Sequence, residues 1–325
     1  MKRYLSILLV LCLSLAIVMG TSSAVAEGKT DYKIGIFLKD STTAFWRYIV
    51  QGATEKANEL GVTLVEYAPA SYTDSAGQIS MIEDAIQSGI DAICIASIDS
   101  AANAPVLEAA EKAGIVVIIF NTKVPNFEAT GLQRTFIGAD NATASHLVAD
   151  AAMKDLDYKA NVVILDGTPG TQMSADRCDP VLALAEAHEG VTIIAREPCY
   201  ANRETGMTVM ENLLQTYDDI DIVWGLNDPT ALGALQAIEA AGREDILVVG
   251  IDGLPEAVAA IMNGRMAYTF DQAPFNMGAL TVEAAVKALN GETLEPVVFT
   301  GGDLIGIDNA KDHLLKYYPT EGWVD

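Results

Sequence analysis

The sequence has few basic residues and few histidines, and each shortage excludes a class of function. It contains 20 Lys and Arg residues against 44 Asp and Glu residues, which gives a formal net charge of −24 at pH 7. A field of that sign repels nucleic acids and anionic membrane surfaces and favours a soluble monomer. We therefore expect no nucleic-acid partner and no lasting membrane contact beyond transient docking on a membrane protein.

The usual signatures of catalysis and of metal binding are also missing. The three histidines, His146, His188 and His313, have no Cys, Asp or Glu partners at metal-ligand spacing. The sequence contains no Gly-x-Ser-x-Gly elbow, no complete phosphate-binding loop and no dinucleotide fingerprint. We therefore expect a protein that is not an enzyme, with no catalytic residue, no metal and no cofactor.

Long apolar runs are absent except at the N-terminus. Lys2-Arg3 precede an apolar run from Leu5 to Met19, and Ala24-Val25-Ala26 supplies a small-x-small cleavage pattern. The alternative is an uncleaved anchor, but the run is shorter than the ~20 residues of a typical membrane span. We predict a cleavable signal peptide at residues 1–26 and a periplasmic or otherwise extracytoplasmic location.

Cysteine is scarce as well, with four residues in the whole chain. Cys94 lies in a predicted strand and is expected to be a small buried hydrophobe. Cys178 and Cys199 lie near predicted strand ends, and an oxidising compartment permits a bond between them. The sequence does not supply the Cβ geometry that such a bond requires, so the question stays open at this point.

After Asp31, short β-branched runs alternate with amphipathic stretches, a pattern typical of βα units on a parallel sheet. The pattern occurs in two similar series and predicts an α/β protein with two doubly wound parallel-sheet lobes. The strands expected in the first series are 33–38, 62–67, 92–96, 116–120 and 135–138. Those expected in the second are 161–165, 191–196, 220–225, 246–250 and 266–270. The helices expected between them are 43–60, 75–88, 101–113, one ending near 156, 176–188, 204–216, 230–241 and 255–263. A further helix at 274–290 and strands at 297–299 and 304–307 complete the prediction.

Three successive strands of the second series end in polar side chains. Asn227-Asp228, Asp252 and Asp271-Gln272 each follow an apolar run. The carboxyl ends of parallel strands line one crevice, so these side chains should converge on a small ligand. A carboxylate accepts hydrogen bonds and an amide both donates and accepts, which suits the hydroxyl groups of a neutral molecule.

Three segments give the chain a family resemblance over nearly its whole length after the predicted leader. They are Val209–Leu214, Asn227-Asp228 with Ala231–Leu235, and Val248–Gly253. In this order and spacing they resemble the periplasmic sugar-binding proteins of the ribose-binding type (type I periplasmic binding proteins), the receptors of ABC importers. The resemblance implies two lobes joined by a three-segment hinge that closes over the ligand. We assign residues 27–139 plus 273–299 to the N-terminal lobe, and residues 140–272 plus 300–325 to the C-terminal lobe.

The same resemblance implies a set of ligand-binding residues. Phe45 and Trp46 match an aromatic pair that sandwiches a sugar ring, and Arg177 matches an arginine that follows a Gly-Thr-rich turn. The strand-end residues Asn227, Asp252 and Gln272 match family ligands that the strand pattern also selects. Thr43 stands where the family has an asparagine, and Asn121-Thr122 stand where it has an Asp-Arg pair. The predicted ligand set is Phe45, Trp46, Thr43, Asn121, Arg177, Asn227, Asp252 and Gln272.

The departures from the family pattern bear on the ligand. They remove a charged pair and an amide, mostly from the first lobe, where Ala96 also replaces an asparagine. A site built to hydrogen-bond one array of hydroxyls rejects analogues that leave its polar groups unpaired. We therefore expect a small sugar or polyol other than ribose itself. The leading hypothesis is an ABC-importer receptor that works with permease subunits. The alternatives are a receptor of the same fold that signals to chemotaxis or to a sensor kinase, and the sensing domain of a transcriptional repressor. The export signal disfavours the repressor.

Overall fold

The structure is a computed structural model that describes residues 31–124 and 135–318, and the predicted signal peptide lies outside these residues. The first sheet has six parallel strands in the order β11-β5-β4-β3-β1-β2. Their apolar residues are mostly Ile, Val and Phe, as expected of strands covered on both faces. The strands are β1 (Lys33–Phe37), β2 (Thr63–Tyr67), β3 (Ala92–Ile95), β4 (Val116–Phe120), β5 (Phe136–Gly138) and β11 (Val297–Phe299).

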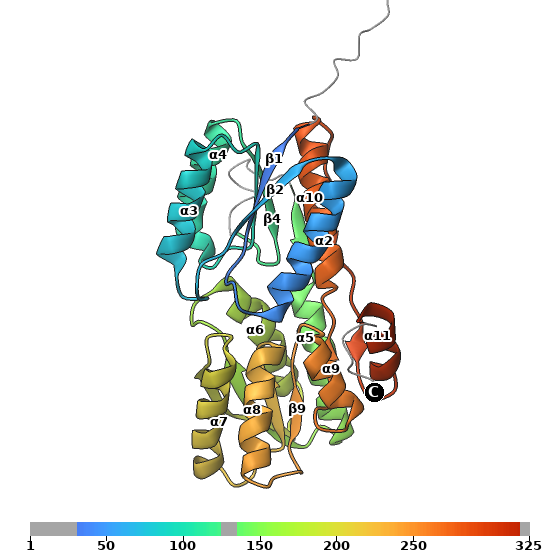
Figure 1. The fold of residues 1–325 in the computed structure, drawn as a ribbon. Coiled ribbons are helices and arrows are strands. Elements are labelled where there is room, and N and C mark those ends of the chain that lie inside the picture. The colour runs from blue at the N-terminus through green and yellow to red at the C-terminus, as the bar shows by residue number, and fades with distance from the viewer. Residues whose placement is uncertain (1–30, 125–134, 319–325) are drawn as a thin grey trace, which may run out of the picture. The chain divides into compact units, whose positions relative to one another are not determined.

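Helices cover both faces of this sheet (Figure 1). On one face α2 (Ala44–Leu60) and α10 (Pro274–Leu289) pack over Ile34, Ile36 and Phe120. On the other face lie α3 (Ser75–Gln87) and α4 (Ser100–Lys112). Because alternate side chains of each strand point to opposite faces, one strand supplies both of these cores.

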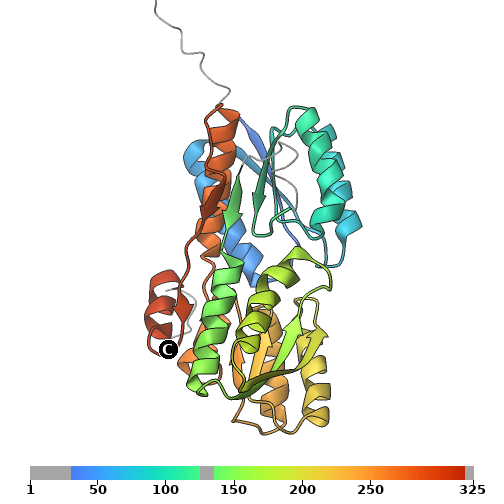
Figure 2. The ribbon, with the colours of Figure 1, turned by 180° about the vertical axis from the view of Figure 1, so that it is seen from behind.

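The second sheet has four parallel strands in the order β7-β6-β8-β9 and is likewise covered by helices (Figure 2). A separate antiparallel pair joins β10 to β12. The strands are β6 (Ala160–Asp166), β7 (Val191–Pro198), β8 (Ile222–Gly225), β9 (Leu247–Val249), β10 (Thr269–Phe270) and β12 (Leu304–Ile305). The helices are α5 (Asn141–Asp155), α6 (Gln172–Glu186), α7 (Arg203–Thr216), α8 (Asp228–Ala240) and α9 (Pro255–Met262). The predicted α/β class with two doubly wound parallel sheets is confirmed.

Some local expectations differ from the structure. The run expected as a strand at 266–270 forms only the short β10, because Tyr268 makes an isolated bridge to Val249 instead of extending the ladder. The helix α11 (Ala310–Tyr317) was not expected at all. It buries His313 and Leu314 and packs against α9.

The chain passes between the two sheets three times, and the connecting segments are hydrogen-bonded to one another. The backbone N–H of Thr300 donates to the carbonyl of Gly138 at 3.0 Å, and its hydroxyl donates to the carbonyl of Gln272 at 3.0 Å. The N–H of Asp271 donates to the carbonyl of Asp303 at 2.9 Å. These contacts tie the three connecting segments together, and we call these segments the hinge strip. The residue boundaries that we assign to the two lobes stay a prediction.

Two glycines allow α2 and α10 to pack closely. A Cβ atom on Gly52 would lie 1.9 Å from the carbonyl oxygen of Phe275, and one on Gly278 would lie 1.9 Å from that of Ile49. Neither space admits a methyl group. Helix α10 follows the second crossing of the chain, so this contact fixes the hinge strip against the first sheet.

The cysteines of the described residues, Cys94, Cys178 and Cys199, are all free and buried. The bond between Cys178 and Cys199 that the sequence left open is therefore not formed in the structure. Burial raises the pKa of all three thiols, that of Cys199 to about 12. Within residues 31–124 and 135–318, none of the helices combines the length and apolar character needed to cross a bilayer.

Candidate functional site

Two predicted strand-end side chains, Asp252 and Gln272, are in direct contact. Asp252 lies just beyond β9 and Gln272 just beyond β10. The Nε2 group of Gln272 donates to Oδ1 of Asp252 at 2.6 Å, and both side chains are buried. Gln272 also belongs to the second crossing segment. The backbone joins the same two residues, because the N–H of Gln272 donates to the carbonyl of Asp252 at 3.4 Å.

Arg177 joins this pair from α6. Its Nη1 lies 3.5 Å from Oδ1 of Asp252 and donates to the carbonyl of Leu226 at 2.8 Å, while Nε donates to Oδ1 of Asn141 at 2.9 Å. The Arg177 side chain is buried, and these partners hold the guanidinium in one orientation. A buried charge requires such pairing, since desolvation is otherwise too costly.

The backbone at Asp252 is in a conformation that side chains rarely adopt. Its φ angle is 144°, and the hydrogen bond from its N–H to the carbonyl of Phe270, at 3.0 Å, holds it there. Non-glycine residues with such angles cost of order 1–3 kcal/mol and cluster at ligand-clamping sites. In this conformation the Asp252 carboxylate contacts Arg177 and Gln272.

Asn227 and Asp228 have different roles from each other. The side-chain oxygen of Asn227 accepts hydrogen bonds from the N–H and the hydroxyl of Thr230 at the start of α8, and its Nδ2 donates to the carbonyl of Ala201 at 3.3 Å. Asp228 is fully buried and accepts from the N–H of Leu254 and from the hydroxyl of Thr269. Asn227 thus caps its helix and keeps an amide at the site, whereas both carboxylate oxygens of Asp228 are used internally.

Burial alters the titration of both acids. Loss of hydration raises the pKa of Asp228, and the nearby charge of Asp252 raises it further. Loss of hydration also raises the pKa of Asp252, while the Arg177 guanidinium and the Gln272 amide oppose that rise. The partners of Asp252 therefore favour its ionised form, which is the form that accepts hydrogen bonds from hydroxyl groups.

The first sheet contributes Asn121, Thr122 and a lysine that the sequence analysis missed. Nζ of Lys39, just beyond β1, donates to Oγ1 of Thr122 at 2.6 Å, and that hydroxyl donates to Oδ1 of Asn121 at 3.0 Å. Asn121 follows β4 and has a φ of 61°. Lys39 would have been found if the strand-end argument had been applied to the first series as well as to the second.

The predicted aromatic pair is buried in the core beside these residues. Phe45 and Trp46 are each 2% exposed, and their rings meet edge to face with centroids 5.2 Å apart. Nε1 of Trp46 donates to the hydroxyl of Tyr72 at 2.9 Å. Their role in stacking on a sugar ring stays a prediction, and Tyr72 joins them as a polar neighbour that sequence reasoning did not identify.

Thr43 stands at the start of α2 and is held by Asp40. Its N–H donates to Oδ1 of Asp40 at 2.8 Å, and its hydroxyl lies 2.9 Å from Oδ2. Thr42 donates to the same carboxylate. Asp40 thereby fixes the two residues that precede α2 and places a carboxylate beside the N-terminus of the helix, where a negative charge is stabilising.

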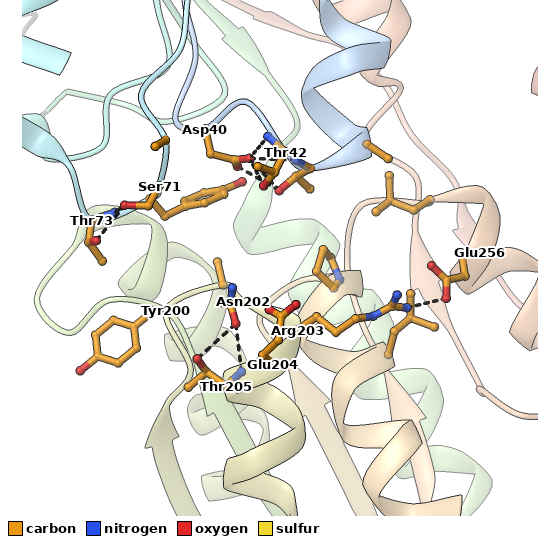
Figure 3. Close-up of a pocket in the computed structure, with 18 residues that line it drawn as sticks. Asp40, Thr42, Ser71, Thr73, Tyr200, Asn202, Arg203, Glu204, Thr205 and Glu256 are labelled. Carbon is orange, nitrogen blue, oxygen red and sulfur yellow. Dashed lines mark hydrogen bonds and ion pairs between the residues drawn. The ribbon is translucent and has the colours of Figure 1, made fainter. Parts of the chain in front are cut away.

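A cavity of about 600 Å³ opens beside the buried residues (Figure 3). One side is formed by Asp40, Thr42 and Ser71, and the opposite side by the first turn of α7 with Asn202 and Glu204. Thr43 is the predicted ligand residue that lines this cavity. Asn121, Arg177, Asn227, Asp252 and Gln272 lie buried beyond its lining.

The cavity nevertheless adjoins the buried residues on both sides. Leu254, two residues after Asp252, and Ala201, which accepts from Asn227, both line it. Asp40 follows Lys39 directly. The buried polar and charge-paired side chains therefore lie next to a cavity that is large enough for a small ligand. The described residues include no cluster of His, Cys, Asp and Glu that could hold a metal ion.

Two parallel sheets, a three-segment connection and a polar cluster at strand ends define a solute-binding protein of the periplasmic type. Residues 34–293 match the family model described as "Periplasmic binding protein domain", and the chain belongs to that family. This is a family of sugar-binding receptors and not of enzymes, and it is extracytoplasmic.

Two relatives and two solved structures illustrate the similarity. The ribose import binding protein RbsB of Bacillus subtilis (strain 168) is 30% identical over 304 residues, which is 92% of this chain and 97% of the relative. The D-ribose/D-allose-binding protein of Pseudomonas aeruginosa is 30% identical over 84% of this chain and 87% of its own length. An ABC transporter periplasmic solute binding protein from Actinobacillus succinogenes 130z with bound D-allose has a TM-score of 0.82 and 28% identity, covering 87% of this chain and 100% of that one. One from Bacillus halodurans C-125 with bound myo-inositol has a TM-score of 0.82 and 27% identity, covering 89% of this chain and 100% of that one.

Proposed function

We propose that this protein is the extracytoplasmic receptor of an ABC importer and captures a small neutral sugar or polyol. The observation that carries the proposal is the buried contact of Asp252 with Arg177 and Gln272, next to a cavity of about 600 Å³. Its relatives and structural neighbours support the proposal, since their ligands include ribose, allose and myo-inositol.

The proposed site uses the eight residues selected from the sequence. Asp252 accepts hydrogen bonds from ligand hydroxyls, Arg177 donates to ligand oxygens, and the amides of Asn121, Asn227 and Gln272 do either. Phe45 and Trp46 supply apolar ring faces and Thr43 a hydroxyl at the rim. Aromatic faces together with fixed hydrogen-bonding groups are the usual means of holding an amphipathic sugar ring.

Ligand capture is proposed to act through closure of the two lobes about the three connecting segments. A ligand shifts a conformational equilibrium only by its difference in affinity for the two states. A guest that contacts Asn121 on one side and Asp252 on the other stabilises the closed state, which then docks on permease subunits. In this proposal the protein is a monomer that is exported by a cleavable leader, residues 1–26.

The ligand is proposed to differ from ribose. Ala96 and Asn121-Thr122 leave the first sheet without the amide and the charged pair that the ribose-type pattern carries, so the array of fixed hydrogen-bonding groups differs. The test is a thermal-shift screen of the purified protein with D-ribose, D-allose, D-arabinose, myo-inositol and glycerol. A specific ligand raises Tm by mass action. If no compound of the panel raises Tm at millimolar concentrations, the proposed capture of a small sugar or polyol is contradicted.

Transport and signalling are separated by a second experiment. Deleting the gene of the cognate permease should abolish uptake of the labelled ligand while the receptor still binds it. If uptake persists and a chemotactic or kinase response is lost when the receptor is removed, the alternative signalling role is favoured.

A further inference from the structure

Lys39 is a buried cation whose charge is incompletely paired. Its side chain follows β1, the residue is 4% exposed, and Nζ donates to Oγ1 of Thr122 at 2.6 Å. In the part of the chain that the structure describes, no carboxylate lies within ion-pair distance of this nitrogen. An ammonium group has three donors, so one bond to a neutral hydroxyl leaves two of them without a protein acceptor.

The groups that act on Lys39 come from both sides of the site. Arg177 on α6 and Asp252 beyond β9 act on it through space, and Asp40 is its neighbour in the chain. Tyr72, from the loop after β2, is also close enough to Asp40 and Asp252 to interact with their charges. Lys39 and Arg177 supply two positive charges, and Asp40 and Asp252 supply two carboxylates. Loss of hydration and the charge of Asp252 raise the pKa of Asp228 and favour its uncharged form, so the remaining charges balance without an ionic ligand.

We propose that Lys39 contacts the ligand and determines specificity, by donating two hydrogen bonds to oxygens of a neutral polyhydroxylated ligand. This inference rests on the proposed function. A hydroxyl group both accepts and donates. When it lies between an ammonium and a carboxylate, it accepts from Lys39 and donates to Asp252 or Asp40, so that all three groups are satisfied. A carboxylate on the guest would instead meet the acids of the same site.

The protonation of Lys39 gives this inference a measurable signature. Burial and the nearby Arg177 guanidinium together lower the pKa of Lys39 to about 7, against the opposing effect of Asp252. Ligand oxygens that accept from the ammonium favour its charged form and raise this pKa in the complex. Binding near and above pH 7 therefore takes up a fraction of a proton, and affinity falls as the pH rises through this range.

The experiment compares the parent protein with Lys39→Met and Lys39→Gln. The probe is the panel member that gives the parent its largest Tm shift, and binding is measured by titration calorimetry at pH 7.5 in phosphate and in Tris. The dependence of the binding enthalpy on the buffer gives the number of protons taken up. Lys112→Met, an exposed lysine on α4, is the matched control.

We expect the parent to take up a fraction of a proton and both Lys39 variants to take up less. The Lys39 variants should bind at least tenfold more weakly, while Lys112→Met behaves as the parent. Circular dichroism and melting curves establish that each variant is folded. Because Met and Gln differ in polarity, a folding defect in one leaves the other as the test.

Every other outcome overturns either this inference or the proposed function. Equal affinity and equal proton uptake in the Lys39 variants would overturn the inference and leave the proposed function standing. Weaker binding with unchanged proton uptake would also overturn it, because that result indicates a purely structural role. Tighter binding of D-galacturonate than of any neutral sugar would overturn the neutral ligand class. A parent protein that binds no member of the panel would overturn the proposed function and this inference with it.

Discussion

At the residue scale, Asp252 combines a buried carboxylate, a φ of 144° and two polar partners on different elements. Replacing it by alanine would leave the Arg177 guanidinium facing an empty space, and removing one partner of a buried pair is strongly destabilising. Asparagine keeps the shape and the acceptor for Gln272 while it removes the charge. It is therefore the substitution that separates binding from folding.

We expect Asp252→Asn to weaken ligand binding by about 1.5–3 kcal/mol, roughly one to two powers of ten in Kd, because a hydrogen bond to a charged acceptor is lost. Calorimetry with the best ligand of the panel measures this change. Asp219→Asn, at an exposed position, is the control and should bind as the parent does. Unchanged affinity in Asp252→Asn would show that the site is elsewhere.

Asp271, in the hinge strip, gives a prediction about pH. Burial raises the pKa of Asp271 to about 7, against the hydrogen bond from the N–H of Ala273. An unfolded Asp has a pKa of about 3.9. The folded chain therefore retains this proton at pH values at which the unfolded chain has released it. The contribution of Asp271 to stability is fully present below about pH 4 and is lost as the pH rises toward about 7.

The matching variant is Asp271→Asn, which keeps an oxygen acceptor for the N–H of Ala273 and does not ionise. The Tm difference between variant and parent should be small at pH 4 and should grow in favour of the variant up to pH 7.5. Scanning calorimetry over this range measures it. Asp308→Asn, which is exposed, should show no such trend, and a flat difference for Asp271→Asn would contradict the argument.

At the scale of elements, the contact between α2 and α10 depends on two glycines. We expect Gly278→Ala to destabilise the protein by about 1–3 kcal/mol, the usual cost of overpacking, although alanine normally favours a helix interior. Urea unfolding gives the free energy of unfolding. Gln51→Ala, on the exposed side of α2, is the control. A stabilised Gly278→Ala variant would show that the two helices separate at little cost.

Strand and helix positions followed from the sequence where hydrophobic periodicity was strong. The strands from β1 to β8 match the predicted ranges to within two residues at either end, since short apolar runs rich in β-branched residues are typical of buried strands. Helix α6 begins four residues earlier than expected because Thr171 caps it. Helix α11 was missed because it is short, and its contact with α9 stabilises it more than its own pattern does.

The candidate site was predictable only in part. The strand-end rule selected Asn227, Asp252 and Gln272, and the structure joins the last two directly. The cap that Asn227 forms on Thr230 is a local contact, and the preference for Asn at helix starts could have indicated it. Local sequence did not indicate that Asp228 is buried, because its burial depends on contacts with Leu254 and Thr269. Such distant contacts are set by packing between elements and leave no local pattern.

At the scale of the whole molecule, the proposed closure predicts a change of distance across the cavity. Ser71 and Glu204 are exposed and line opposite sides of it. With spin labels at these two positions, a saturating ligand should shorten and narrow the distance distribution measured by pulsed electron resonance. The control pair is Glu204 with Asp219, both on the second sheet's side, and its distance should not change. An unchanged distribution for the Ser71–Glu204 pair would contradict closure.

The buried thiols have a practical consequence. Cys94, Cys178 and Cys199 are inaccessible, and the raised pKa of each keeps it in the unreactive protonated form at neutral pH. Maleimide dyes would therefore modify a single engineered cysteine at Glu204 and leave the native ones untouched. A fluorophore placed there, at the rim of the cavity, would turn the protein into an optical sugar sensor without prior removal of its own cysteines.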